Sequence, residues 1–260
     1  MSLLAEERKN RILETLNMDG KVTVRSLSDK FNVTTETIRR DLDELEGLGK
    51  LKKVHGGAIK ITFDGQEPPY HQRETIHIEE KKAIGKLAAG LVKDNEIIAL
   101  DVGTTTLQLI PFLLHKKNLT VVINSVSALT LLIEYKNNHL FSGRIIFLGG
   151  EINSNQMSSY GPITEGILKE FYFDKAFIAV GGISLKHGLT GYDVNEGSLS
   201  KKIMENTKEI IVVADHSKIG VRNFYKIANL HHIDIIVSDK EPPNEWKNEL
   251  IHHDITWLNP

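Results

Sequence analysis

The stretch Thr34–Ala58 constrains the fold most, because it predicts one helix followed directly by a tight β-hairpin. Its apolar residues recur at spacings of four, three and three, so they share one helix face. They are Ile38, Leu42, Leu45 and Leu48. A hydroxyl of Thr34 or Thr35 can cap the start of this helix. Short strands are predicted at residues 50–54 and 58–61, joined by a turn whose glycines adopt positive φ without steric cost.

Two further helices are predicted upstream of this stretch. The first covers residues 2–17 and turns an apolar face inward. The second covers Val24–Phe31 and can be capped by Thr23. Three helices with a short turn between the second and the third, followed by a hairpin, form a winged helix-turn-helix, whose third helix enters the major groove of DNA. Residues 1–61 are therefore predicted to be a DNA-binding domain.

The candidate DNA contacts are polar and basic residues on the third helix, on the hairpin and around the start of the second helix. They are Lys21, Arg25, Thr34, Thr35, Thr37, Arg39, Arg40, Lys52, Lys53 and His55. Arg39 and Arg40 can offer a bidentate fork to guanine, and phosphate contact is equally open. The hairpin residues are expected to contact phosphates. The alternative is that the helix charges only pair with Glu36, Asp43 and Glu44 four residues away, as on a solvated helix face.

Charge and composition narrow the class of protein further. The chain has 260 residues and a formal net charge of −2, so it is not a generic nucleic-acid binder as a whole. Residues 1–61 hold 12 Lys and Arg against 10 Asp and Glu, and the remaining residues hold 20 against 24. The sequence has no cysteine, no apolar leader and no apolar run of membrane-spanning length, so we expect a cytoplasmic protein without disulfides or thiolate metal sites.

The segment that follows, residues 62–75, is predicted to be a surface linker. Gly65 and the pair Pro68-Pro69 break helical and strand periodicity alike. Arg73 in this segment is expected to be solvated, and the alternative is that it contacts the C-terminal domain. The linker would connect the DNA-binding domain to the rest of the chain.

From residue 76 onward, apolar strands alternate with helices. Strands are predicted at residues 96–102, 119–123, 144–148, 175–180, 209–214 and 233–237, and helices at 79–92, 105–114, 126–135, 163–171, 196–207 and 243–250. The strands are near-continuous apolar runs, as expected where helices cover both faces of a mostly parallel sheet. Residues 76–260 are therefore predicted to form an α/β domain.

Polar residues and glycines collect where these strands end. The candidate ligand-binding residues are Asp101, Gly103, Thr104, Thr105, Thr106, Asn124, Ser125, Gly150, Gly181, Glu196 and Lys218. Ligands of open α/β sheets bind beyond the carboxyl ends of the strands. The Gly103–Thr106 run opens a predicted helix, so its N–H groups and hydroxyls can hold a phosphate, while Asp101 and Glu196 can accept hydrogen bonds from sugar hydroxyls. The alternative is local: the glycines make tight turns and Thr105 caps its helix.

Several of these motifs together resemble the DeoR family of bacterial transcription regulators. The carrying residues are TIRRDL at 37–42, HGGA at 55–58, D-x-GTTT from Asp101, Asn124-Ser125 and ADHSK-x-G ending at Gly220. The resemblance covers nearly the whole chain. It implies a repressor of sugar-catabolic genes, usually oligomeric, with an effector domain similar in fold to ribose-5-phosphate isomerase. It also implies phosphosugar contacts from Gly103, Thr104, Thr105, Thr106, Asn124, Glu196 and Lys218. Ile123 and Ser200 depart from the family pattern, which commonly has threonine and lysine there.

Two classes of function remain open at this point. The leading hypothesis is a DNA-binding repressor of at least dimeric state, controlled by a phosphosugar bound in the α/β domain. The alternative is a sugar-phosphate isomerase or hydrolase that carries a DNA-binding module, with Asp101 or Glu196 as general base. An activator is a third possibility. No cofactor is expected, and no metal either, because the pairs His231-His232 and His252-His253 have no supporting carboxylate pattern.

Overall fold

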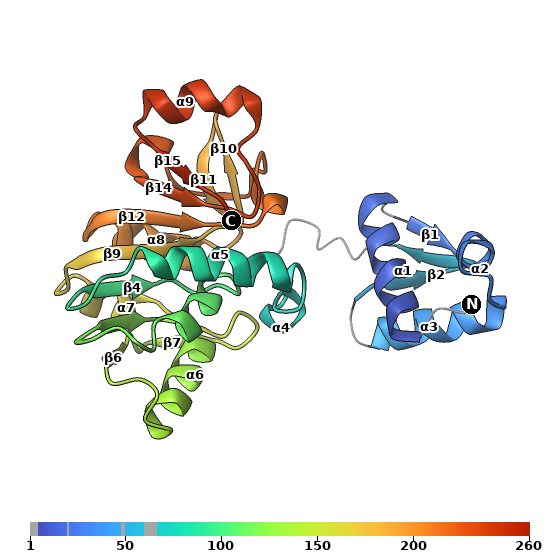
Figure 1. Cartoon of the computed structure of the whole chain (residues 1–260), viewed down its shortest axis with the longest axis horizontal. Coiled ribbons are helices and arrows are strands. Elements are labelled where there is room, and N and C mark those ends of the chain that lie inside the picture. Colours follow the sequence, from blue (N-terminus) through green and yellow to red (C-terminus); the bar gives the residue numbers. More distant parts are fainter. Residues whose placement is uncertain (1–4, 20, 48–49, 60–66) are drawn as a thin grey trace. The chain divides into compact units, whose positions relative to one another are not determined.

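The computed structural model describes residues 5–19, 21–47, 50–59 and 67–260. The chain divides into two compact units, Met1–Asp64 and Gly65–Pro260 (Figure 1). The predicted residues Leu48, Gly49, Lys60 and Ile61 fall outside the described residues. Within the described ranges, no helix is both long and apolar enough to cross a membrane.

The first unit is a small helical domain with a three-stranded antiparallel sheet. Its elements are α1 (Ala5–Asp19), β1 (Lys21–Thr23), α2 (Val24–Phe31), α3 (Thr35–Gly47), β2 (Lys52–Val54) and β3 (Gly57–Ile59). The sheet has the order β1-β3-β2, so β3 of the predicted hairpin pairs on both sides. The predicted three helices and hairpin are confirmed, whereas β1 was not predicted. Its three residues alternate between exposed and buried, but three residues are too few to indicate a strand from the sequence.

Local hydrogen bonds set the ends of these helices. The Thr23 hydroxyl accepts a hydrogen bond from the Ser26 N–H at 3.1 Å and caps α2, as predicted. The Thr34 hydroxyl accepts from the Thr37 N–H at 3.2 Å at the start of α3. In the turn of the hairpin, Gly56 has a φ of +82°, which favours glycine.

A buried ion pair ties the first helix to the third. Nε and Nη2 of Arg8 donate to the two carboxylate oxygens of Asp41 at 2.6 and 2.9 Å. Their side chains are only 8% and 6% exposed. The pair lies beside the apolar core that Ile12, Ile38 and Leu42 build between α1 and α3. Asp41 of the TIRRDL motif therefore holds α3 in place from its inner side.

The second unit is built on a seven-stranded sheet in which all neighbouring strands run parallel (Figure 1). In order across the sheet, its strands are β15 (Thr256–Leu258), β14 (Ile235–Val237), β12 (Thr207–Val213), β9 (Phe173–Ala179), β4 (Ile97–Leu100), β5 (Thr120–Ile123) and β6 (Arg144–Phe147). The six predicted strands are confirmed, and β15 at the edge is an addition. The strand order reverses direction between β4 and β9, which is the topological switch point of the sheet.

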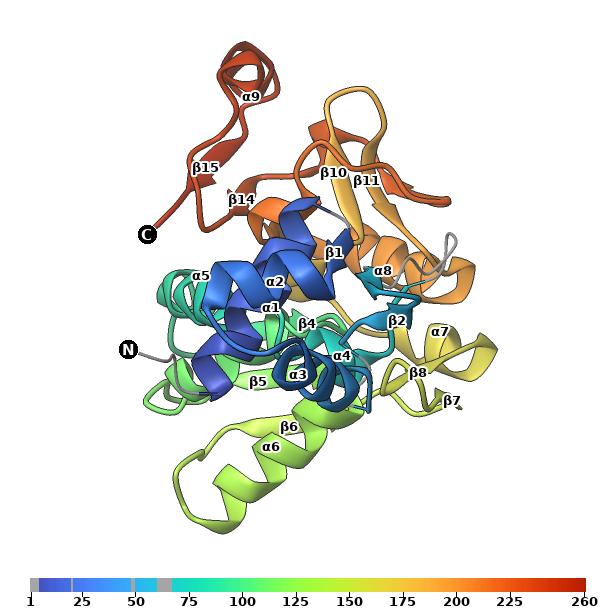
Figure 2. The same cartoon turned by 90° about the vertical axis from the view of Figure 1, so that its right-hand side faces the viewer.

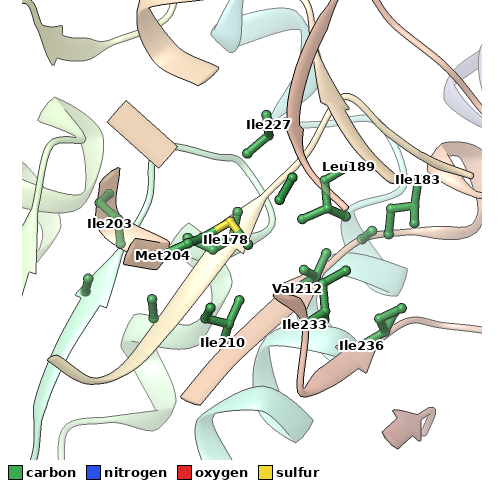
Figure 3. Packing of buried hydrophobic residues seen from close by; sticks show 14 of the residues in the cluster. Ile178, Ile183, Leu189, Ile203, Met204, Ile210, Val212, Ile227, Ile233 and Ile236 are labelled. Atoms are coloured by element: carbon green, nitrogen blue, oxygen red, sulfur yellow. The ribbon is translucent and has the colours of Figure 1, made fainter. Parts of the chain in front are cut away.

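Helices cover both faces of this sheet, because consecutive strand residues point to opposite sides. They are α5 (Ile78–Gly90), α6 (Val126–Asn137), α7 (Pro162–Leu168), α8 (Val194–Glu205) and α9 (Lys247–His252). Ile178 and Val212 face a core that includes Ile203 of α8 (Figure 3). The neighbouring Phe177 and Ile211 face the other core, under α5. A second view shows α6 beside β6 and α9 beside β15 (Figure 2).

Two small β-structures were not predicted, and two predicted helices are wholly or partly 3₁₀ helix. The additions are the hairpin β7 (Glu151–Asn153) and β8 (Ser158–Tyr160), and an antiparallel sheet of β10 (Gly182–Ser184), β11 (Gly188–Gly191) and β13 (Tyr225–Ala228). The predicted helix at 105–114 is a 3₁₀ helix, η1 (Thr106–Phe112), which contains Pro111. Three further short 3₁₀ segments are η2 (His216–Lys218), η3 (Leu230–His232) and η4 (Asn244–Trp246), the last of which leads into α9.

Residues 62–75 were predicted to lie at the surface as a linker, and within the described part this is wrong for Tyr70 and Arg73. Residues 67–75 pack into the second unit and include the short helix α4 (Tyr70–Arg73). Tyr70 is 2% exposed, and its N–H donates to the Asn155 carbonyl at 2.8 Å. Arg73 is not solvated either, since its side chain is 15% exposed and paired with Glu67. Proline and polar residues indicated a loop correctly, but they could not indicate what the loop packs against.

Candidate DNA-binding surface and effector pocket

The outer face of α3 carries the basic residues predicted to contact DNA. The side chains of Arg39 and Arg40 are 58% and 84% exposed. Arg39 donates to Glu36 at 3.2 Å, and Nε of Arg40 lies 4.0 Å from Glu44. Exposed pairs of this kind contribute little stability, so exchanging the carboxylate for a DNA phosphate costs little. Both arginines are therefore exposed on the helix face that the sequence predicts to contact DNA.

The other predicted DNA contacts surround this helix within the first unit. Thr34 and Thr35 are exposed at its start, and Thr37 is half-buried, with its hydroxyl 2.9 Å from that of Thr34. The hairpin of β2 and β3 is the wing of this domain. On the wing, Lys53 forms an ion pair with Asp43 of α3, and the Lys53 N–H donates to Glu46 at 2.7 Å. These bonds join the wing to the helix. His55, Lys21 and Arg25 are exposed, whereas the side chain of Lys52 lies outside the described part.

The second unit has a small, partly open polar pocket at the switch point between β4 and β9. Its walls come from the ends of both strands, from the start of α8 and from the segment before α4. The lining residues that carry charge or a polar side chain are Glu67, Arg73, Asp101, Tyr192, Asp193, Glu196 and Ser200. Of the predicted ligand-binding residues, this pocket brings together Asp101, Gly181 and Glu196.

Two carboxyl groups of the pocket are poised between their charged and neutral forms at neutral pH. Asp101 is 2% exposed and accepts hydrogen bonds from the Ser200 hydroxyl at 2.6 Å and the Val102 N–H at 2.8 Å. Burial raises the pKa of Asp101 to about 7. Burial likewise raises the pKa of Glu196 to about 7, although the Ser158 hydroxyl donates to it at 2.7 Å. Such groups can both donate to and accept from the hydroxyls of a ligand.

The threonine loop after β4 is buried, and its residues differ in how they are used. The Thr106 hydroxyl lies 2.8 and 2.9 Å from the carbonyls of Asp101 and Gly103, so it stabilises the loop itself. Thr105 makes no side-chain cap to η1, so the alternative that it only caps a helix is wrong. Thr104 is also buried, at 4% exposure. A Cβ on Gly103 would lie 2.5 Å from Cβ of Ala179, which explains glycine at this close approach.

The remaining predicted residues lie at other strand ends rather than in the wall of this pocket. The Ser125 hydroxyl accepts from the Ala128 N–H at 3.2 Å and caps α6, which is a structural role. Asn124 is 1% exposed, and its side-chain amide makes no hydrogen bond with any residue that the structure describes. Gly150 lies at the base of the β7–β8 hairpin, and Lys218 is half-buried in η2.

A buried lysine that the sequence reading missed lies close to Lys218. Lys81 of α5 is 4% exposed, and its Nζ donates to the Arg73 carbonyl at 2.6 Å. Burial lowers the pKa of Lys81 to about 8. The negative charge of Asp215 raises this pKa, and the positive charge of Lys218 lowers it further. Asp215 caps η2 through the Ser217 N–H at 2.9 Å. The spacing of Lys81 from Ile84 and Ala88 places it on the inner face of α5, and that spacing is the signal that could have found it.

A helix with two exposed arginines beside a β-hairpin, and a polar pocket in a separate α/β unit, are the features of a winged helix-turn-helix regulator with a sensor domain. Residues 8–63 match the family model described as the DeoR-like helix-turn-helix domain, and residues 76–240 match the DeoR C terminal sensor domain. The chain belongs to the DeoR family of transcription regulators. It is a DNA-binding regulator, which confirms the resemblance found in the sequence.

Curated relatives over nearly the whole chain are regulators of the same kind. The HTH-type transcriptional regulator GolR of Listeria innocua is 34% identical over 235 residues, covering 90% of this chain and 91% of the relative. The glycerol-3-phosphate regulon repressor of Escherichia coli is 29% identical over 249 residues, covering 96% of each chain. These relatives are named as regulators rather than enzymes. Ribose 5-phosphate isomerase A from Methanocaldococcus jannaschii aligns at 20% identity and a TM-score of 0.40 over 55% of each chain, a likeness that says nothing about function.

Proposed function

We propose that this regulator is a repressor of a sugar-catabolic operon, and that a phosphorylated sugar or polyol bound in the second unit controls its affinity for operator DNA. The observation that carries the proposal is the pair of buried carboxyl groups, Asp101 and Glu196, lining one pocket at the switch point of the sheet. Neutral carboxyls facing a small polar pocket suit the hydroxyl groups of a sugar or polyol.

The phosphate would lie beside the pocket rather than inside it. Four acidic residues line the pocket against the one arginine named among its walls, so a phosphate there would meet like charge. Lys81 and Lys218 together outweigh the single charge of Asp215. Thr104 and Thr105 belong to the loop that follows the pocket residue Val102. We therefore assign the phosphate to these two lysines and to the threonine loop. A 3₁₀ helix of seven residues gives this loop less of a helix dipole than the sequence predicted.

The regulator is proposed to act in the cytoplasm as a homo-oligomer. Two-fold operators need two recognition helices, hence at least a dimer. Large apolar side chains on the surface of the second unit support contact between subunits. Tyr172, Phe224 and Ile163 are 79%, 80% and 65% exposed.

The proposal is tested by thermal unfolding of the full chain with sugar phosphates and their unphosphorylated parents. Saturation at 100 times Kd is expected to add about 2.7 kcal/mol to the free energy of unfolding. One phosphorylated compound should raise the melting temperature, and its parent should not. Glu196→Gln should weaken this response, whereas Glu205→Gln, at an exposed position on the same helix, should leave it unchanged. Equal responses to phosphorylated and free sugars would refute the assigned ligand class.

A further inference from the structure

Residues 67–73, at the start of the second unit, form part of the pocket wall, and we call them the joining segment. Glu67 and Arg73 both line the pocket, and Nη1 of Arg73 lies 2.7 Å from Oε1 of Glu67. Nε of Arg73 also donates to the Pro68 carbonyl at 3.0 Å. Glu67 therefore reaches the pocket only a few residues after Asp64, where the first unit ends.

The β7–β8 hairpin holds this segment at its tip. Nη2 of Arg73 donates to Oε1 of Gln156, and Nε2 of Gln156 donates to the Pro68 carbonyl at 3.3 Å. Two residues after Gln156, at the start of β8, the same hairpin carries Ser158, whose hydroxyl donates to Glu196 at 2.7 Å. One short hairpin thus contacts both the joining segment and a carboxyl group of the pocket. A ligand that moves Glu196 also acts on the hairpin.

Glu67 adds a negative charge to a pocket that already holds other acidic residues. It faces the same pocket as Asp101 and Glu196, and its negative charge raises the pKa of both. Arg73 is the one cation among the described lining residues, so Glu67 depends on Arg73 for a partner. A guanidinium can hold a ligand oxygen as well as a carboxylate, through the same planar fork.

We propose that Arg73 contacts the effector, and that it exchanges Glu67 for ligand oxygens when the pocket fills. This inference rests on the proposed function and adds its mechanism of regulation. Glu67, without its partner, leaves the acidic pocket and takes residues 67–69 with it. The ligand binds only the state in which Glu67 has left Arg73, and the two states differ in the contacts of the joining segment. A ligand can change DNA affinity only through such a difference in its own affinity for two states. Gln156 is the positioning residue that keeps the segment on the hairpin.

The first test removes the competing carboxylate. Glu67→Gln in the full chain keeps the size of the side chain but removes its charge, and Glu74→Gln is a matched control at an exposed position of the same segment. The probes are glycerol 3-phosphate, ribose 5-phosphate, glucose 6-phosphate and fructose 6-phosphate, measured by calorimetric titration. Loss of one charge-assisted bond to Arg73 should tighten the binding of the active probe about tenfold in Glu67→Gln, and Glu74→Gln should match the wild type. Equal affinity of the two variants would overturn the exchange.

The second test separates binding from its consequence for DNA. The DNA is a duplex selected by the wild-type chain from a random pool, and its release by the active probe is followed by fluorescence anisotropy. Gln156→Ala should bind the probe within about threefold of the wild type, yet need at least about tenfold more probe to release DNA. A melting curve establishes that the variant folds, and Arg73→Lys is the second variant should it not. Arg73→Lys should weaken binding of the probe.

Each result distinguishes this inference from the function on which it rests. Binding and release that are both unchanged in Gln156→Ala and Arg73→Lys would overturn the inference and leave the proposed function standing. A wild-type chain that binds none of the four probes would overturn both. Tighter binding in Glu67→Gln together with impaired release in Gln156→Ala would support the exchange and the role of the hairpin.

Discussion

The ion pair between Arg8 and Asp41 allows the sharpest prediction about the DNA-binding unit. Two parallel hydrogen bonds of 2.6 and 2.9 Å join side chains that are both less than a tenth exposed. Replacing Arg8 by alanine leaves the Asp41 carboxylate buried without its cation, which costs about 3–5 kcal/mol in comparable pairs. A domain of this size has a free energy of unfolding of only about 5 kcal/mol, so most of its stability should be lost.

Hydrogen exchange of the full chain, followed by mass spectrometry, measures this loss within α1 and α3. Protection of their core amides should fall by about a hundredfold to several thousandfold, which is the same energy expressed as an opening equilibrium. Arg11→Ala is the matched control on the same helix. Arg11 donates to Glu7 at 3.1 Å, but their side chains are 53% and 50% exposed, so its loss should cost less than about 1 kcal/mol.

A double substitution tests the physical reason. Arg8→Met with Asp41→Leu removes both charges and fills a similar volume, so stability should return to within about 1 kcal/mol of the wild type or exceed it. Equal protection in Arg8→Ala and Arg11→Ala would refute the reasoning, because the buried pair would then be worth no more than a surface pair. Lost DNA binding with unchanged protection would instead place Arg8 at the DNA.

Three further predictions concern DNA contacts and titration. Replacing Arg39 or Arg40 by alanine should weaken binding to a selected operator by about 1–3 kcal/mol if the arginine reads a base, and unchanged gel shifts for both would remove α3 from the interface. Lys53→Ala should lower the slope of log affinity against log salt by about one, and an unaltered slope would exclude a phosphate contact by this residue. Asp101→Asn should flatten the dependence of stability on pH. The folded state keeps the proton of Asp101 up to about pH 7, whereas the unfolded state loses it near 3.8, so the free energy of unfolding of the wild type should fall by up to about 4 kcal/mol as pH rises across that window. Parallel curves for the variant and the wild type, measured by denaturant unfolding, would contradict the raised pKa.

Periodicity predicted the parts of the fold that depend on local sequence. The stripe of Ile38, Leu42 and Leu45 is buried in α3 as expected, and Thr23 caps α2. The apolar runs of β4 and β5 became inner strands of the sheet. In each case, the residues that decide the structure lie within a few positions of one another. Strands of three or four residues, such as β10 and β11, have too few alternations to show a period.

The pocket could be predicted only in part, because its chemistry depends on distant pairs. Asp101 was identified from its place after a strand, but its raised pKa reflects burial, which outweighs the opposing effect of a hydrogen bond from Ser200, 99 residues away. Arg73 was assigned to solvent, and its partner Gln156 is 83 residues away. The pattern of residues around one position does not show which distant residue the fold will bring next to it. Ser200 is a further example, since only the folded structure shows that its hydroxyl donates a hydrogen bond to Asp101.

The energetic cost of the two carboxyl groups is itself an argument that the pocket binds a ligand. Above pH 7, keeping Asp101 charged in its buried place costs about 4 kcal/mol relative to water, a large share of the stability of a domain. Asparagine could fill the same space and accept the Val102 N–H bond without a charge, so packing alone does not require aspartate. A group that gives and takes protons near neutral pH is useful where hydroxyls must be recognised in either orientation. The presence of both Asp101 and Glu196 at one small pocket is thus better explained by binding than by stability.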